Sequence, residues 1–479
     1  MEAFDLGRKA EGGTHGVTEA LARRRGGVLC HITSLPGPNA VGTLGSGATA
    51  FLDFVARAGL SVWQILPLNP PDVHGSPYHS ASLFALDPAL LDPALELTNI
   101  ARLRRYADVR SDSLERFVAD QAHWLPDFCR FSVAAARYGA NWSTWPPPLR
   151  LRDGDALEQF DRLYADEIEL ARLYQFAIDD SFAKLRVEAA SRGVLLFGDM
   201  PLYPAYDSAD VWAHQDLFLL DHHQRPRFVA GVPPDYFSAT GQLWGNPVYD
   251  WDRLAETGFA WWLDRLNSQL RLFDIVRIDH FRGLEAFWAV PPGAQSAVAG
   301  SWRYAPGRGL LQAFSQRFGH LPLVAEDLGV ITPEVDALRK EFSLPGMRVL
   351  QFAFSGDPNN PHLPSNYVPN TVAYTGTHDN DTTKGWYAGL DERTRGSVDK
   401  LAGTDGEIPW RLIDVVFRSK ANLTIAPLQD FLGLDSRHRM NTPGIVGGNW
   451  RWRFNHDELT PELATRISSL VAASDRVSE

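Results

Sequence analysis

Four carboxylates stand close behind short apolar runs of the sequence, where polar side chains can do chemistry. Asp199 follows VLLFG, Asp279 follows DIVRI, Glu326 follows PLVA, and Asp379 follows TVAYTGTH. The last three are 47 and 53 residues apart, about the length of one strand–helix unit or slightly more. Because the carboxyl ends of neighbouring parallel strands meet at one edge, these side chains are expected to converge there.

Converging carboxylates without a thiol or histidine partner suit the cleavage of a glycosidic bond. One ionised carboxylate attacks the anomeric carbon, a protonated one serves the leaving oxygen, and a third holds sugar hydroxyls. Arg277, two residues before Asp279, is expected to keep that carboxylate ionised. Glu326 has no basic residue close in sequence, so a raised pKa is expected for its carboxyl. A single acidic residue at a strand end is more often a cap or salt-bridge partner, and only the whole set favours catalysis.

The elements that must position these residues are short, unbroken apolar runs separated mostly by helical patterns. Such runs predict parallel strands buried on both faces, and eight of them favour a closed (β/α)8 TIM barrel over an open doubly wound sheet. The predicted strands are residues 28–32, 62–66, 194–198, 274–278, 322–325, 348–353, 371–375 and 423–426. Helices are predicted at 48–58, 251–272, 309–318, 333–341 and 407–420. The fold class is therefore α/β.

A long excursion interrupts the strand–helix alternation after the second strand. Residues 67–190 contain Pro-rich loops such as TWPPPLR and end in a long helical pattern, so a large, mainly helical insertion subdomain is predicted there. A length of 479 residues would allow about three domains, but a barrel with insertions can exceed about 400 residues. Residues 1–479 are therefore expected to form a single catalytic barrel domain, and nothing after about residue 455 is long enough to build a C-terminal β-sandwich.

Composition excludes several classes of protein. Hydrophobic residues make up 44% of the chain and charged residues 22%, as in globular proteins rather than disordered chains. A net charge of −12 argues against nucleic acids and anionic membranes as partners. Cys30 and Cys129 are too few for a disulfide framework, and neither a signal peptide nor a membrane span is visible, which predicts a cytoplasmic protein with reduced cysteines. The 11% of aromatic residues would suit pyranose faces, although core packing claims most of them.

Signals for other chemistries are weak. GTLGSG at 42–47 lacks the glycine spacing of a dinucleotide-binding loop, and the sequence contains no GxxxxGK[ST], HExxH or GxSxG motif. The pair His222–His223 has no further ligands at metal-site spacing, so no metal site is predicted.

Long motifs resemble those of the amylomaltases, the 4-α-glucanotransferases of glycoside hydrolase family 77, which are related to the α-amylases. The resemblance extends from about residue 26 to 454. It rests on VRIDHFRGLEAFW (276–288), LVAEDLGVITPEV (323–335), LPGMRVLQFAF (344–354) and YTGTHDNDTTKGW (374–386), supported by LCHITSLPG (29–37), SPYHSASLFA (76–85), AGVPPDYFSATGQLWGNPVYDW (230–251) and MNTPG (440–444).

The resemblance implies a role for each matching residue. Asp279 would be the nucleophile, Glu326 the general acid/base and Asp379 the carboxylate that stabilises the transition state. The implied substrate-binding residues are Ser76, Tyr78, Asp199, Phe237, Gln242, Trp244, Arg277, His280, His378 and Asn441. Tyr78 would lie under the donor ring, and Gln242 and Trp244 would lie on a long loop that closes over the glucan. The family needs neither a metal nor an organic cofactor.

The expected substrates are α-1,4-glucans, maltooligosaccharides and glucose, and the expected reaction is retaining transfer to the 4-hydroxyl of an acceptor. An α-amylase-type hydrolase with the same three carboxylates is the first alternative, and a non-catalytic glucan-binding protein is a second. The chain departs from the family pattern at DVHG (72–75), where a Tyr is common, at His79 in SPYHS, and at Ala239. These positions bear on outer glucan contacts and leave the three carboxylates intact.

Overall fold

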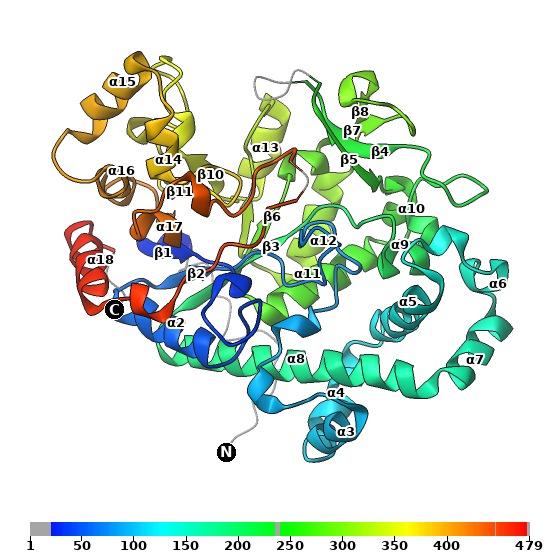
Figure 1. The fold of residues 1–479 in the computed structure, drawn as a ribbon. Coiled ribbons are helices and arrows are strands. Elements are labelled where there is room, and N and C mark those ends of the chain that lie inside the picture. Colours follow the sequence, from blue (N-terminus) through cyan, green and yellow to red (C-terminus); the bar gives the residue numbers. More distant parts are fainter. Residues whose placement is uncertain (1–20, 235–239, 446, 477–479) are drawn as a thin grey trace.

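Eight parallel strands close into a barrel in the computed structural model, which describes residues 21–234, 240–445 and 447–476 (Figure 1). Around the barrel their order is β1-β12-β11-β10-β9-β6-β3-β2. Each strand therefore lies beside the barrel strands that precede and follow it along the chain, and β12 closes the barrel against β1. Their bounds are β1 Arg25–Leu29, β2 Val62–Gln64, β3 Leu195–Met200, β6 Ile275–Ile278, β9 Leu323–Ala325, β10 Gly346–Val349, β11 Thr371–Tyr374 and β12 Leu423–Pro427. The predicted (β/α)8 barrel is confirmed.

Burial on both faces explains why these strands lack the alternation of a half-exposed sheet. Every residue of β2, β6, β9, β11 and β12 is buried, because one face fills the barrel interior and the other lies under the helices. The helices of the barrel half of the chain are α2 Ser46–Arg57, α11 Ala260–Leu272, α12 Gly307–Phe318, α13 Pro333–Glu341, α14 Thr383–Ala388, α15 Glu392–Ala402, α16 Ile408–Phe417, α17 Leu428–Phe431 and α18 Pro461–Ala473.

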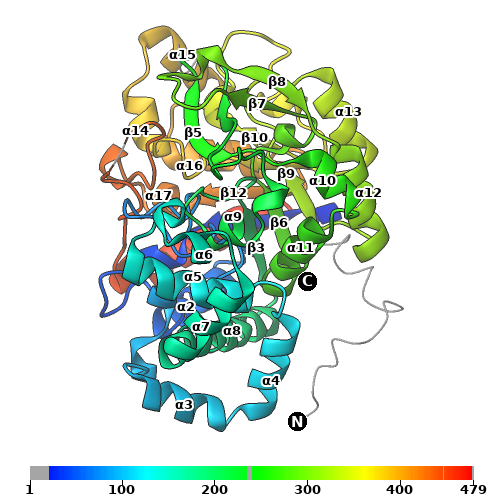
Figure 2. The ribbon, with the colours of Figure 1, turned by 90° about the vertical axis from the view of Figure 1, so that its right-hand side faces the viewer.

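Helices dominate the segment between β2 and β3, as Figure 2 shows below the barrel. They are α3 Ile100–Asp108, α4 Ser111–Asp120, α5 Leu125–Tyr138, α6 Pro147–Arg150, α7 Gly154–Leu163 and α8 Ala165–Ser191. The 27-residue α8 contacts α2, β3 and α11 of the barrel as well as α3 and α5 of this segment. It therefore joins the added helices to the barrel wall.

A second sheet of four antiparallel strands was not predicted from the sequence. It has the order β5-β4-β7-β8 and contains β4 Val229–Val232, β5 Gln242–Pro247, β7 Ala286–Val290 and β8 Ser301–Tyr304. In Figure 1 it lies above the barrel, on the side away from α8. Gln242 and Trp244 belong to β5, so their expected placement on a loop is wrong, because pairing with β4 makes this stretch a strand.

Two predicted elements differ in their bounds. The helix expected at 251–272 is divided into α10 Trp251–Glu256 and α11, because Gly258 and Phe259 both take left-handed backbone angles, with φ of 63° and 60°. The strand expected at 348–353 begins earlier and ends at Val349, since Gly346 already pairs with Ala325 of β9 and a 3-10 turn follows at Leu350–Phe352.

After β12 the described residues contain helices and turns but no further strand. The remaining short helix, α9 Ala209–Ala213, follows β3. Within the described ranges no helix combines the length and apolar character of a membrane span. The same ranges hold no group of three or more His, Cys, Asp or Glu side chains arranged to bind a metal ion.

Candidate active site

Asp279 follows β6 directly and shares an arginine with Asp199. Nη1 of Arg277 lies 2.9 Å from Oδ1 of Asp279 and 2.7 Å from Oδ1 of Asp199, which sits on the neighbouring strand β3. Burial raises the pKa of Asp279 above its ordinary value, and the guanidinium of Arg277 opposes that rise. The ion pair expected from the sequence is therefore present. Its effect on Asp279 is partial, because burial outweighs it.

Glu326 follows β9 directly and is buried, with 9% of its surface exposed. Its Oε2 accepts a hydrogen bond from the backbone N–H of His280 at 2.8 Å, and its Oε1 accepts one from Leu328 at 2.8 Å. Burial raises the pKa of this carboxyl to about 7, against the opposing charge of Arg277. A carboxyl that titrates near neutral pH can both give and take a proton, as a general acid/base must.

His280 takes a left-handed backbone conformation, with φ of 48°, directly after Asp279. This conformation is costly for a residue with a Cβ, and here it accompanies the N–H donation to Glu326. Its ring meets that of Trp244 edge-on at a centroid distance of 4.8 Å, and Nε1 of Trp244 donates to Oε1 of Gln242 at 3.2 Å. The second sheet thus brings two expected binding residues to His280, the neighbour of Asp279. Burial lowers the pKa of His280 to about 3, which leaves its imidazole neutral at ordinary pH.

Asp379 lies in the loop between β11 and α14, five residues after the strand. Its Oδ1 accepts a hydrogen bond from Nδ2 of Asn441 at 2.6 Å, and its Oδ2 lies 3.3 Å from Nε2 of His378. Arg439 donates to its backbone carbonyl at 2.8 Å. The carboxylate is 43% exposed, so it can contact a ligand from this anchored position.

Tyr78 connects the two sides of the site. Its hydroxyl donates to Oδ2 of Asp199 at 2.8 Å, and its ring stacks on His378 with centroids 5.2 Å apart and planes 12° apart. Trp450 tilts against both rings, at 5.8 Å from Tyr78 and 5.9 Å from His378. Partly exposed Ser76 precedes Tyr78 in a turn, where its N–H donates to Oδ1 of Asp72 at 2.9 Å.

These contacts connect most of the predicted residues in two groups, one around Arg277 and Tyr78 and one around Glu326 and His280. Phe237 lies outside the described residues. Sequence reasoning missed Arg439 and Trp450, which come from the segment after β12. The only signal nearby was MNTPG, and the run GGNWRW that contains Trp450 would have been the pattern to notice.

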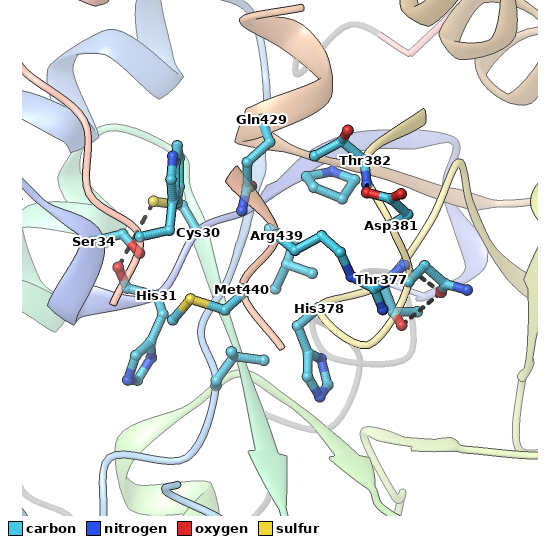
Figure 3. Close-up of a pocket in the computed structure, with 15 residues that line it drawn as sticks. Cys30, His31, Ser34, Thr377, His378, Asp381, Thr382, Gln429, Arg439 and Met440 are labelled. Atoms are coloured by element: carbon cyan, nitrogen blue, oxygen red, sulfur yellow. Dashed lines mark hydrogen bonds between the residues drawn. The ribbon is translucent and has the colours of Figure 1, made fainter. Parts of the chain in front are cut away.

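A small pocket is lined in part by residues of the loop that carries Asp379. Figure 3 shows Thr377, His378, Asp381 and Thr382 on one side of it and Cys30, His31 and Ser34 on the other. Gln429, Arg439 and Met440 complete the labelled lining. Side chains therefore do not fill all of the space beside this loop.

The residues of the site lie in the part of the chain that matches a known protein family. The model of glycoside hydrolase family 77, described as 4-alpha-glucanotransferase, matches residues 30–108 and 94–460. The chain belongs to this family. A 4-alpha-glucanotransferase of Thermus thermophilus is 42% identical over 94% of this chain and 99% of its own, and one of Synechocystis is 44% identical over 94% and 97%.

Solved structures of the family agree with the fold. An amylomaltase from Streptococcus agalactiae in complex with acarbose superposes with a TM-score of 0.91, at 31% identity, over 95% of this chain and 100% of that chain. An amylomaltase from Corynebacterium glutamicum, at 20% identity and a TM-score of 0.77, shares the fold. Membership of glycoside hydrolase family 77 confirms the resemblance read from the motifs and the expected class of enzyme, the 4-α-glucanotransferases.

Proposed function

We propose that this chain is a retaining 4-α-glucanotransferase in which Asp279 is the nucleophile, Glu326 the general acid/base and Asp379 the stabiliser of the transition state. The observation that carries the assignment is the unlike environment of two carboxyl groups. Arg277 contacts the carboxylate of Asp279 at 2.9 Å, whereas the carboxyl of Glu326 is held by two backbone N–H groups and burial raises its pKa to about 7. Retaining glycosidases need this division between an ionised nucleophile and a protonated acid.

In the first step Asp279 attacks the anomeric carbon of an α-1,4-linked glucose, and the bond to the leaving oxygen breaks. Glu326 gives its proton to that oxygen, so the shortened glucan leaves as an alcohol and the rest remains as an ester of Asp279. Asp379 and His378 are placed to hold hydroxyls of the donor sugar, and the stacked Tyr78 offers it an aromatic surface.

In the second step the 4-hydroxyl of another glucan or of glucose attacks the ester. Glu326, now a carboxylate, takes the hydroxyl proton, and Asp279 leaves with its charge restored beside Arg277. Two inversions at one carbon retain the α configuration. We propose Ser76, Asp199, Phe237, Gln242, Trp244, Arg277, His280 and Asn441 as further residues that bind or orient the glucans.

Transfer differs from hydrolysis only in what attacks the ester, so the product count distinguishes them. Incubation with maltotriose should give glucose together with a ladder of longer maltooligosaccharides, while the number of reducing ends stays nearly constant. Reducing ends that increase as fast as glucose is released would establish the hydrolase instead. An unchanged chromatogram would establish a glucan-binding protein without catalysis.

Compartment and domain organisation belong to the same proposal. We place the enzyme in the cytoplasm with α-1,4-glucans, maltooligosaccharides and glucose as its substrates, and with neither nucleic acid nor membrane as a partner. Both cysteines are buried and free, as suits a reducing compartment. Residues 1–479 would act as one catalytic unit, with residues 67–190 as a helical subdomain inside it.

A further inference from the structure

We propose that Asp430 is a positioning residue for Asp379: it fixes both ends of the loop on which the transition-state carboxylate stands. The inference rests on the role proposed above for Asp379. Asp430 lies in α17, directly after β12, with only 1% of its surface exposed. It therefore acts through the loop and has no access to substrate.

One carboxylate group contacts the two ends of this loop. Oδ2 of Asp430 accepts hydrogen bonds from the hydroxyls of Thr375 and Thr383, both at 2.6 Å. Oδ1 accepts the backbone N–H of Thr383 at 2.7 Å. Thr375 is the first residue after β11, and Thr383 is the first residue of α14. The side chain of Asp430 thereby sets the separation of the two points from which the loop rises.

An acidic residue suits this position because three donors converge on it. A carboxylate only accepts hydrogen bonds and offers two oxygens for them, whereas an amide has one oxygen and a nitrogen that donates. Burying the charge is costly, and the three donors offset part of that cost: burial raises the pKa of Asp430, and the hydrogen bonds from Thr375 and Thr383 oppose the rise. Helix capping does not explain the residue, since Thr382 already caps α14 by accepting the N–H of Gly385 at 3.2 Å.

Between its ends the loop also has contacts with residues outside it. Gln351 donates to the carbonyl of Asp381 at 2.9 Å, Ser436 donates to the carboxylate of Asp381 at 2.7 Å, and the N–H of Asn441 donates to the carbonyl of His378 at 3.1 Å. The pocket in Figure 3 is lined by Thr377, His378 and Asp381, so side chains do not fill all of the space beside the loop. At Asp379 itself, Asn441 holds the carboxylate, and Arg439, which also lines the pocket, holds the backbone carbonyl. Because the loop starts at Thr375 and ends at Thr383, a shift of either residue would move Asp379 relative to the sugar. Misplacement by about 1 Å can cost a factor of about 100 in rate.

The decisive variants are Asp430→Ala and Asp430→Asn, compared with the wild type in maltotriose disproportionation. Asp430→Ala removes all three acceptors, and we expect kcat per folded molecule to fall about 100-fold while KM changes less than about threefold. Asp430→Asn keeps an oxygen for the Thr383 N–H and a nitrogen that can donate to the threonine hydroxyls. It should recover at least about tenfold of the lost rate. Hydrogen exchange of residues 375–383 should be faster in Asp430→Ala.

Arg476→Met provides a matched control for lost stability. Arg476 is fully buried and donates to the carbonyls of Arg25, Phe417, Ser419, Ala421 and Asn422, at the opposite end of β1 and β12 from Asp430. Its loss should lower the melting temperature at least as much as Asp430→Ala does, because it leaves several buried acceptors unpaired. It should leave kcat per folded molecule and exchange of residues 375–383 unchanged.

Each result decides the proposal. It is overturned if kcat of Asp430→Ala falls only as its folded fraction falls, if Asp430→Asn is no better than Asp430→Ala, or if loop exchange is the same in Asp430→Ala as in Arg476→Met. If the wild type is active, these outcomes overturn only the role of Asp430 and leave the proposed transferase function standing. A wild type that makes no ladder from maltotriose refutes the proposed function, and the exchange comparison then still decides whether Asp430 holds the loop.

Discussion

Nη1 of Arg277 lies 2.9 Å from Oδ1 of Asp279, two residues further along the chain at the end of the same strand. The same nitrogen lies 2.7 Å from Oδ1 of the buried Asp199, so a single guanidinium compensates two carboxylates. Asp279 therefore receives only part of the compensation that an exclusive ion pair would give. This explains how its pKa is raised by burial although an arginine touches it.

The pH dependence of donor cleavage should follow these two carboxyl groups. Asp279 must be ionised, and its raised pKa moves the acid limb above the pH range of an ordinary aspartate. Glu326 must be protonated, so kcat/KM for maltotriose should fall as pH rises through about 7. Initial rates from about pH 4 to 9 measure both limbs.

An α-glucosyl fluoride donor is the control for the alkaline limb. Fluoride leaves without a proton, so the rate at which this donor loads Asp279 should stay level across pH 7. An alkaline limb that persists with the fluoride would show that the group titrating there is not the acid catalyst.

Asp279 and Glu326 should respond differently when the leaving group needs no proton. Glu326→Ala should be inactive on maltooligosaccharides, whose sugar leaving group must be protonated, but should still form the ester from an α-glucosyl fluoride. Azide needs no base and should release the sugar with the α configuration. Chromatography and NMR of the glucosyl azide measure the outcome.

Asp279→Ala is the matched comparison, because it removes the other carboxylate of the pair. It cannot form the ester and should give no α-azide; any product would be the β-azide from direct displacement. A β product from Glu326→Ala, or an α product from Asp279→Ala, would mean that the two roles are assigned the wrong way round.

Tyr78 and Trp244 should each contribute an aromatic surface to glucan binding. The loss of such a ring should cost roughly 1–3 kcal/mol of binding free energy. Tyr78→Ala or Trp244→Ala should therefore lower kcat/KM roughly 5- to 150-fold without unfolding the protein. Steady-state kinetics beside circular dichroism measures both quantities. Tyr78→Phe keeps the stacking on His378 and removes only the hydrogen bond to Asp199, so it should lose less. Activity that follows the folded fraction alone would show that both rings are only core.

The number and order of the barrel strands could be predicted because each strand is buried on both faces and therefore appears in the sequence as a short apolar run. The same reasoning located the carboxylates of Asp279 and Glu326, since each follows its strand directly. The second sheet could not be predicted in this way. β4 and β5 are partly exposed and interrupted by Gly231 and Gly245, and β8 is entirely exposed. β7 alone is a buried apolar run, and it carries no sign of the antiparallel partners that make it part of a second sheet.

The sequence by itself thus determined the barrel, the three strand-end carboxylates and, through long motifs, the family. Only the tertiary structure decided their environments: the sharing of Arg277, the two N–H groups on Glu326, and the anchoring of Asp379. The physical reason is that these contacts join residues far apart in the chain. Tyr78 and Asp199 are 121 residues apart, and Asn441 and Asp379 are 62 apart. No local pattern encodes such pairs, because only the folding of the segments after β2 and β12 over the barrel brings them within hydrogen-bond distance.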